Sequence, residues 1–175
     1  MTFIDSLFVY LSSAGPLGVF FLSALTNATV FLPLPALEIV LFALGSTNFF
    51  GLGFFSPLLL GACAGLGASI GELSAYFLGR GGRHVLKKFN PQQAHKIKEY
   101  GEKLKEKGFF ALAVFAFLPL PFDLAGVAAG LVHFPMHKFM LGCAVGKTPR
   151  YAIIAYAGYF GVPSLLQLFG LSVVV

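Results

Sequence analysis

The sequence predicts an all-α integral membrane protein: an inverted repeat of a re-entrant helical hairpin plus a transmembrane helix, with interfacial helices. Three observations support this fold class. Of the 175 residues, 57% are hydrophobic and only 11% are charged, whereas soluble domains average about 25% charged residues. The pentapeptide Phe-Leu-Pro-Leu-Pro occurs twice, at residues 31–35 and 117–121. Each copy is followed closely by a carboxylate, Glu38 or Asp123.

The first half of the repeat covers residues 14–80, after a short amphipathic stretch at residues 2–11. That stretch is too brief to span a bilayer and suits the membrane interface. Apolar sequence then runs over residues 14–45 and is interrupted by Pro33 and Pro35. Proline removes a backbone donor and clashes with the preceding helical turn. We therefore expect one helix, a break at the prolines, and a second short helix.

A full span over residues 51–79 completes the first half, with Glu72 inside it. A basic connector at residues 81–108 follows. Nine of the 12 basic residues and three acids lie at positions 80–107, a net charge of +6. The positive-inside rule places this loop in the cytoplasm. Nucleic-acid binding is not expected, because the basic run is a short loop between membrane segments.

A helix is expected within the connector, because Pro91 suits its first position and Gly108 its C-terminal stop. Its lysines are interrupted by a narrow apolar stripe, made of Ala94, Ile97 and Leu104. We interpret this as a surface helix lying on an anionic leaflet. A solvated connector is the alternative.

The second half covers residues 109–160 and repeats the plan of the first. Residues 109–131 are apolar and broken at Pro119 and Pro121, and residues 136–157 form the last clear span. Beyond it, an apolar tail is interrupted at Pro163. The tail is either a partial span or an interfacial helix.

The duplication extends beyond the pentapeptides, because residues 60–65 resemble residues 141–146. If each broken segment enters and leaves by the same face, the two halves have opposite orientation, as in transporters with a site at the midplane. The whole chain, residues 1–175, then forms one polytopic domain. Four glycines are candidates for close helix packing: Gly71, Gly126, Gly130 and Gly146.

Ionisable residues inside the apolar segments are candidates for a lipid or ion path: Glu38, Glu72, Asp123, Lys147 and Arg150. Each would cost about 2.5–3.5 kcal/mol if isolated, so we expect them to pair. Broken backbone at membrane depth must be packed in protein or line a water-filled cavity. We therefore expect Glu38 and Asp123 to share one wet pocket. Two alternatives are a structural Glu72–Arg150 ion pair and a helix-capping role for Asp123.

No catalytic constellation is visible, because the chain has no nucleophile elbow, metal-ligand cluster or phosphate loop. We expect no enzyme, no cofactor and no metal site; an intramembrane hydrolase is the weaker alternative. Cys63 and Cys143 suit buried small hydrophobic positions. A lipid headgroup contact is expected for three residues near an interface: His133, His137 and Lys138.

Two long segments resemble the signatures of the DedA superfamily, also called the VTT-domain or SNARE-associated Golgi protein family. They are Gly-Ala-Ser-Ile-Gly-Glu-Leu-Ser-Ala-Tyr-Phe-Leu-Gly-Arg at residues 67–80 and Phe-Leu-Pro-Leu-Pro-Phe-Asp-Leu-Ala-Gly-Val-Ala-Ala-Gly at residues 117–130. Together with Phe139 and the Gly-Lys pair at residues 146–147, they are most similar to the vacuole membrane protein branch. The resemblance covers residues 31–159.

This resemblance implies two facing re-entrant hairpins and lipid translocation. The family's acidic residue on the first hairpin falls on Glu38, its Gly-Glu pair ends at Glu72, and its Phe-Asp pair ends at Asp123. Bacterial carrier-recycling members have arginines near the positions of Ala116 and Phe122. Neither position is basic here, which favours a general phospholipid scramblase over a polyprenyl-phosphate carrier.

The expected function is energy-independent phospholipid scrambling through a polar groove between the hairpins. The alternative is a proton- or sodium-coupled transporter of an anionic polyprenyl-phosphate lipid, with Glu38 or Asp123 as the coupling site. The expected partners are membrane phospholipids or that lipid, with self-association into a homo-oligomer as an open alternative. The expected location is the plasma membrane of a prokaryote, as a multi-pass protein without a cleaved signal peptide.

Overall fold

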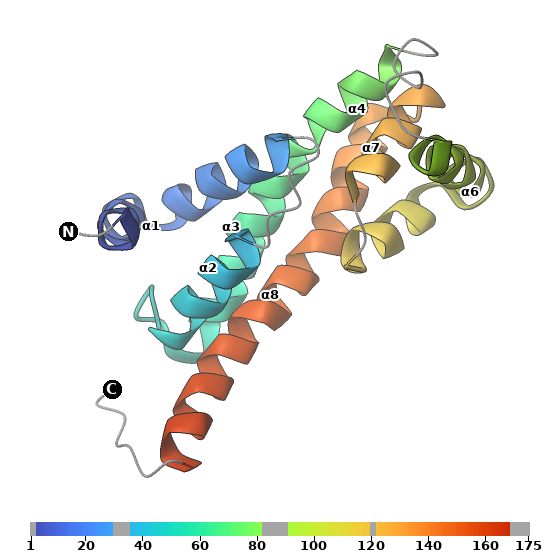
Figure 1. The fold of residues 1–175 in the computed structure, drawn as a ribbon. Coiled ribbons are helices and arrows are strands. Elements are labelled where there is room, and N and C mark those ends of the chain that lie inside the picture. The colour runs from blue at the N-terminus through green and yellow to red at the C-terminus, as the bar shows by residue number, and fades with distance from the viewer. Residues whose placement is uncertain (1–2, 30–35, 82–90, 120–121, 169–175) are drawn as a thin grey trace.

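The computed structural model describes residues 3–29, 36–81, 91–119 and 122–168, and every regular element in these ranges is helical. The elements, in chain order, are α1 (Phe3–Ala28), α2 (Ala36–Ser46), the 3-10 turn η1 (Gly53–Phe55), α3 (Ser56–Gly71), α4 (Leu73–Arg80), α6 (Pro91–Phe117), α7 (Phe122–Leu131) and α8 (Met136–Leu168) (Figure 1). The predicted all-α class is confirmed.

Both predicted breaks are confirmed, because α1 ends eight residues before α2 begins and α6 ends five residues before α7 begins. Pro119 is exposed in the turn that follows α6. Pro33, Pro35 and Pro121 lie outside the described residues. The breaks follow from local chemistry, since a proline cannot donate the hydrogen bond that would continue a helix.

Two long helical rods run side by side through the molecule (Figure 1). The first rod, Gly53–Arg80, is the one helix among the described residues that is both long and apolar enough to cross a membrane. Its α3 and α4 parts are continuous, because the Glu72 amide donates to Ala68 and the Tyr76 amide donates to Glu72. The second rod is α8, whose 33 residues extend for about 50 Å.

The rods are antiparallel and approach closely where α3 has glycines. A Cβ atom at Gly61 would lie 2.5 Å from the backbone nitrogen of Ala152, and one at Gly65 would lie 2.7 Å from the Cα of Thr148. Side chains larger than glycine would therefore push the rods apart. Such small-residue contacts are the usual basis of helix packing in lipid, where van der Waals contact replaces the hydrophobic effect.

The short helices after the breaks pack on the rod of the opposite half. Helix α2 packs against α8, and α7 packs against α4. A Cβ atom at Gly158 of α8 would collide with the carbonyl of Phe42, and one at Gly130 of α7 would collide with the carbonyl of Tyr76. The long helix of each half thus provides the surface against which the short helix of the other half packs.

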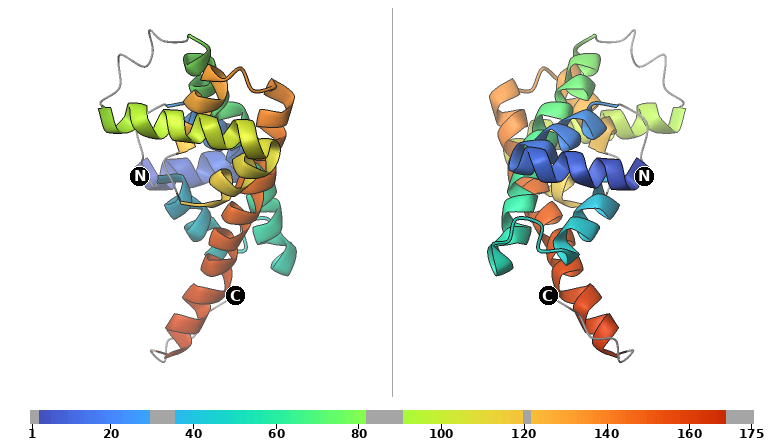
Figure 2. Two further views of the ribbon diagram at one scale, coloured as in Figure 1. Left: turned by 90° about the vertical axis from the view of Figure 1, so that its right-hand side faces the viewer. Right: turned by 90° about the vertical axis from the view of Figure 1, so that its left-hand side faces the viewer.

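Helices α1 and α6 both bend at a glycine with nearly the same backbone conformation. Gly15 has φ 56° and ψ −135°, and Gly108 has φ 55° and ψ −129°. A residue with a Cβ atom is strained at such positive φ values, so glycine is required at both bends. The predicted helix stop at Gly108 is confirmed, and a new helical segment continues to Phe117. The first part of α6 lies across α8 (Figure 2).

Two residues of the apolar stripe of α6, Ile97 and Leu104, are buried in the protein, so these two side chains do not face a lipid leaflet. Ile97 and Leu104 are 0% and 1% exposed within a core that includes residues of α7 and α8. The outward face carries mixed charges, including an ion pair of 2.6 Å between Glu99 and Lys103. The hydrogen bond and charge of Lys103 hold the pKa of the Glu99 carboxyl below its ordinary value.

Helix α8 has a continuous apolar stripe on its outer side, with large exposed residues at intervals of four to eight: Leu141, Val145, Ile153 and Phe160. Two of its charged side chains, Lys147 and Arg150, face inward, toward the other helices. The helix begins at Met136, as predicted, but the interruption expected at Pro163 is wrong, because α8 continues to Leu168.

Candidate functional site

The inner pair, Glu72 with Lys147, lies between the two rods. The Lys147 ammonium donates hydrogen bonds to Glu72 Oε1 and, at 2.6 Å, to Asn27 Oδ1. Its nitrogen also lies 5.1 Å from the centre of the Phe122 ring, a cation–π contact. Both side chains of the pair are only 3% exposed. Charges buried to this degree persist only when they are paired, so the inner pair is a constraint on the packing of four helices.

Asn27 reaches the pair from the last turn of α1 and is itself held in place. Its side-chain nitrogen donates to the Ser23 carbonyl at 2.9 Å, which leaves the oxygen facing Lys147. The Tyr151 hydroxyl lies 3.5 Å from the same oxygen. Ser23 in turn donates to the Ala64 carbonyl of α3 at 2.6 Å. The end of α1 is therefore fixed against both rods by polar contacts.

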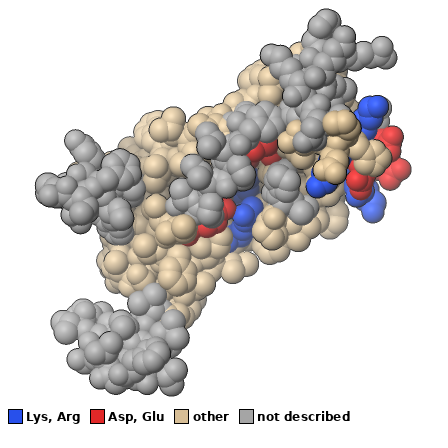
Figure 3. Space-filling view, in the orientation of Figure 1, with Lys and Arg blue, Asp and Glu red and all other residues tan. Residues whose placement is uncertain are grey.

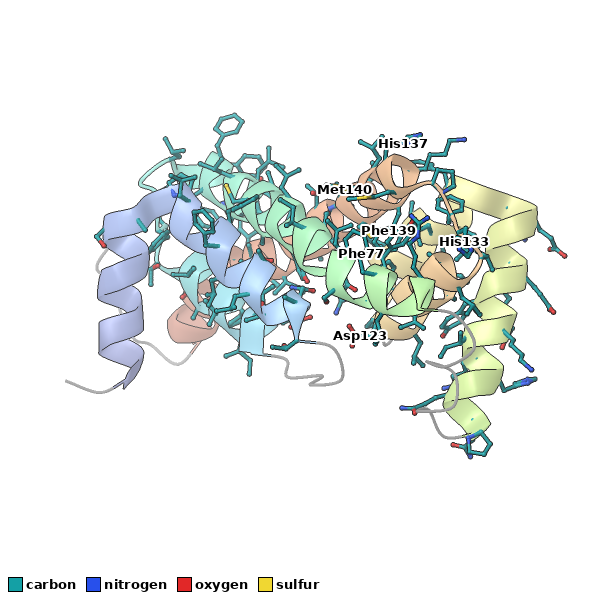
Figure 4. The ribbon with its side chains drawn as sticks, turned by 90° about the horizontal axis from the view of Figure 1, so that it is seen from above. Phe77, Asp123, His133, His137, Phe139 and Met140 are labelled. Atoms are coloured by element: carbon teal, nitrogen blue, oxygen red, sulfur yellow. The ribbon has the colours of Figure 1, made fainter. Side chains whose placement is uncertain are left out.

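The second oxygen of Glu72, Oε2, is buried and has no hydrogen-bond donor among the described residues. It faces α7, where a Cβ atom at Gly126 would lie 3.7 Å away. Asp123, near the start of α7, is close enough for its charge to act on Glu72. Figure 4 shows Asp123 near the middle of the molecule, whereas His133 and His137 lie toward the side that carries α6.

The outer pair, Glu38 with Arg150, is partly open to solvent. Arg150 Nη2 donates to Glu38 Oε1 at 2.9 Å, and the two side chains are 20% and 28% exposed. The other guanidinium nitrogen, Nη1, is 3.4 Å from the carbonyl oxygen of Leu118, one residue before Pro119. Arg150 therefore connects the two breaks: it contacts the first turn of α2, which follows the first break, and the end of α6, which precedes the second.

All five predicted path residues thus lie in one region, which we call the charged cluster: Glu38, Glu72, Asp123, Lys147 and Arg150. Acidic and basic side chains reach the surface together near the middle of the face shown in Figure 3, apart from a second group of charges at the end that carries α6. A guanidinium can donate two parallel hydrogen bonds to the oxygens of one phosphate group. The outer pair is thus the part of the charged cluster whose cation is partly exposed.

The alternative ion pair between Glu72 and Arg150 is wrong, because Glu72 pairs with Lys147 and Arg150 pairs with Glu38. Positions 147 and 150 differ by about 60° around the helix and by about 4.5 Å along it. That offset directs Lys147 toward α3 and α4, and Arg150 toward α2.

The four predicted packing glycines all lie at contacts between helices. Gly71 faces the backbone of α1, and Gly126 faces Ala75 of α4. Gly130 faces the backbone of α4, and Gly146 faces the backbone of α6. Each contact holds an element that carries or adjoins a charged residue of the cluster.

Several contact groups were not identified from the sequence: the side chains of Asn27, Phe122 and Tyr151, and the carbonyl of Leu118. Asn27 does interrupt an apolar run, and a lone amide in such a run was the available signal. The sequence does not single out the other three, because a ring or a carbonyl contacts a charged group only when the fold brings the two together. Among the described residues, no group of three His, Cys, Asp or Glu side chains could hold a metal ion.

The helical fold and the paired charges within it define a membrane protein with a polar site between its helices. A family model, the VTT domain, matches residues 34–160. The chain belongs to this family, the SNARE-associated or DedA family, and the resemblance inferred from its motifs is confirmed.

A relative from the vacuole membrane protein branch is the Vacuole membrane protein 1 homolog of Dictyostelium discoideum. It is 36% identical over an alignment of 107 residues, and the alignment covers 47% of this chain and 26% of that protein. The match therefore spans about a quarter of the relative's length. No solved structure matches the chain.

Proposed function

We propose that this membrane protein is a non-enzymatic phospholipid scramblase that moves lipids between leaflets without an energy source. One observation carries the proposal: the partly exposed Arg150 guanidinium connects Glu38, after the first break, with the Leu118 carbonyl, before the second. A phosphate-binding cation is thereby held at the place where two interrupted helices meet. We infer that these interruptions are the tips of two re-entrant hairpins.

The depth of the charged cluster supports this proposal. Along α8, nine residues separate Lys138 from Lys147, and nine more separate Lys147 from Tyr156. Each interval is about 14 Å in a helix, close to half of the bilayer's hydrocarbon thickness. Basic and aromatic side chains favour the two membrane surfaces. With Lys138 and Tyr156 at those surfaces, Lys147 lies near the bilayer centre.

The reciprocal packing of the short helices supports an inverted repeat. Helices α2 and α7 each begin after a break, carry an acid in the first turn, and pack on the opposite rod. Helices α1 and α6 bend at glycines with matching dihedral angles. Such pairs of equivalent features are typical of transporters whose site lies at the interface between two repeats.

In the proposed mechanism, the phosphate of a lipid headgroup replaces the Glu38 carboxylate on Arg150. The acyl chains remain outside, against exposed apolar residues such as Ile39 and Phe42 of α2. The inner pair does not exchange, because it is sealed, and it keeps the two rods together while α2 and the end of α6 separate. A headgroup then crosses along polar side chains instead of hydrocarbon, which lowers the barrier.

A coupled transporter of an anionic polyprenyl-phosphate lipid is the second candidate, and the Oε2 atom of Glu72 favours it. This oxygen is buried and has no donor among the described residues. A proton or sodium ion bound there would supply the missing interaction. We also propose that the protein lies in the plasma membrane with its basic connector in the cytoplasm. Both candidate functions allow self-association into a homo-oligomer.

Vesicle reconstitution tests the proposal and separates the two candidates. Vesicles with a fluorescent phospholipid are treated with dithionite, which bleaches only lipids in the outer leaflet. We expect the protein to expose additional lipid at the same rate with and without a proton gradient. A rate that rises with the gradient and falls in Glu38→Gln would support coupled transport. Bleaching no greater than in empty vesicles would reject scrambling.

A further inference from the structure

The outer pair joins two helices of the described membrane region, and both of its partners are partly exposed. Glu38 and Arg150 are 28% and 20% exposed, whereas Glu72 and Lys147 are each 3% exposed. An incoming headgroup therefore meets a cation and a carboxylate side by side. Neither cation of the charged cluster is unpaired, because Arg150 is bound to Glu38 and Lys147 is buried against Glu72.

The charge balance of the outer pair disfavours a headgroup with a net negative charge. One carboxylate, Glu38, is paired there with one cation, Arg150. A headgroup with one negative charge would take Arg150 and leave Glu38 without its cation. Unpaired charge is costly in the low dielectric of a membrane interior. A headgroup carrying both signs adds no net charge to the cluster.

We propose, on the basis of the proposed function, that the outer pair is an exchange site for zwitterionic phosphodiester headgroups such as phosphocholine and phosphoethanolamine. The phosphate takes the Arg150 guanidinium, and the ammonium group takes the Glu38 carboxylate. One ion pair within the protein is replaced by two ion pairs with the lipid, so no charge is left uncompensated while the helices separate. Anionic phosphoglycerol headgroups and polyprenyl phosphomonoesters lack the ammonium group and are the poorer substrates.

The position of Arg150 suits this exchange. Its guanidinium carbon lies 5.8 Å from the centre of the Tyr151 ring, and its Nη1 atom is 3.4 Å from the Leu118 carbonyl. These two contacts hold the guanidinium while Glu38 leaves. Glu38 lies on a different helix, α2, so it can move away from Arg150 with that helix.

Lipid retention tests the inference without requiring transport. The protein is taken from nanodiscs that contain equal amounts of phosphatidylcholine and phosphatidylglycerol, and its retained lipids are counted by native mass spectrometry. We expect the wild type to retain phosphatidylcholine preferentially. Glu38→Gln removes the ammonium partner and leaves Arg150 unpaired, so we expect the ratio to shift toward phosphatidylglycerol by about tenfold.

Glu99→Gln, in the exposed pair of α6, is the matched control and should leave the ratio unchanged. Equal retention of the two lipids by the wild type would overturn the inference, and this result needs no variant to fold. A ratio that is the same in Glu38→Gln and wild type would overturn it as well. Vesicles that scramble both lipids at equal rates would keep the proposed function and reject the headgroup selection. Preferential retention without scrambling would reject the proposed function and keep the exchange site.

Discussion

Replacing Lys147 by methionine removes the cation of the inner pair while keeping a side chain of similar length. The Glu72 carboxylate then has no donor among the described residues, because Oε2 already lacks one and Oε1 loses the ammonium group. Asn27 also loses its 2.6 Å donor and keeps only the Tyr151 hydroxyl at 3.5 Å. The change therefore leaves an uncompensated charge between the two rods.

The cost follows from the burial of the pair. Removing one partner of a buried ion pair typically costs about 3–5 kcal/mol, and both partners here are 3% exposed. A protein of this size loses about 2–4 °C of melting temperature per kcal/mol. We therefore expect Lys147→Met to melt about 10 °C lower. The double variant Glu72→Gln with Lys147→Met has no buried charge and should recover at least half of the loss.

Circular dichroism of the helix signal during heating in detergent micelles measures these shifts. Lys103→Met is the control, because it breaks an exposed, solvent-screened pair in α6 and should leave the melting temperature nearly unchanged. The reasoning would be refuted if Lys147→Met melted with the wild type. It would also be refuted if the double variant were no more stable than the single one.

Two further predictions concern other contacts. Gly130→Ala places a Cβ atom against the Tyr76 carbonyl and should separate α7 from α4. It should therefore cost more stability than Gly15→Ala, whose Cβ atom meets open space and which costs only backbone strain. Equal melting temperatures for the two variants would contradict the close packing of α4 and α7. Lys103 holds the pKa of the Glu99 carboxyl below its ordinary value. The pair therefore stabilises the folded protein at pH values above the pKa that Glu99 has in the unfolded chain, and this stabilisation is lost as the pH falls through the lower pKa that Glu99 has in the folded protein. Lys103→Met should raise the Glu99 pKa in an NMR titration of labelled glutamate, and an unchanged midpoint would contradict the interaction.

Several helix boundaries were predictable because they depend on local chemistry, although Pro163 does not interrupt α8. The two proline pairs predicted the breaks, Pro91 predicted the start of α6, and Gly108 predicted its bend. Proline and glycine act through their own backbone. Their effect can be read without knowing what surrounds them.

The pairing of the charges was less predictable, because it depends on how each helix is rotated about its axis. The sequence identified the five charged residues but assigned Glu72 to Arg150 in one interpretation, whereas Lys147 faces Glu72. The partner of α6 was unpredictable for a similar reason. Its apolar stripe indicated an amphipathic helix, but the sequence did not show which surface the stripe packs against. Ile97 packs in the protein core instead of on lipid.

The most direct test of the central claim compares wild type with Arg150→Gln in vesicles that carry a fluorescent phosphatidylcholine. The account predicts that wild type exposes inner-leaflet lipid to dithionite without any gradient. Arg150→Gln should slow this exposure by about tenfold, the loss of one charge-assisted hydrogen bond to phosphate, while Lys103→Gln leaves it unchanged. Equal rates in wild type and Arg150→Gln would contradict the claim that a lipid phosphate crosses the bilayer at Arg150.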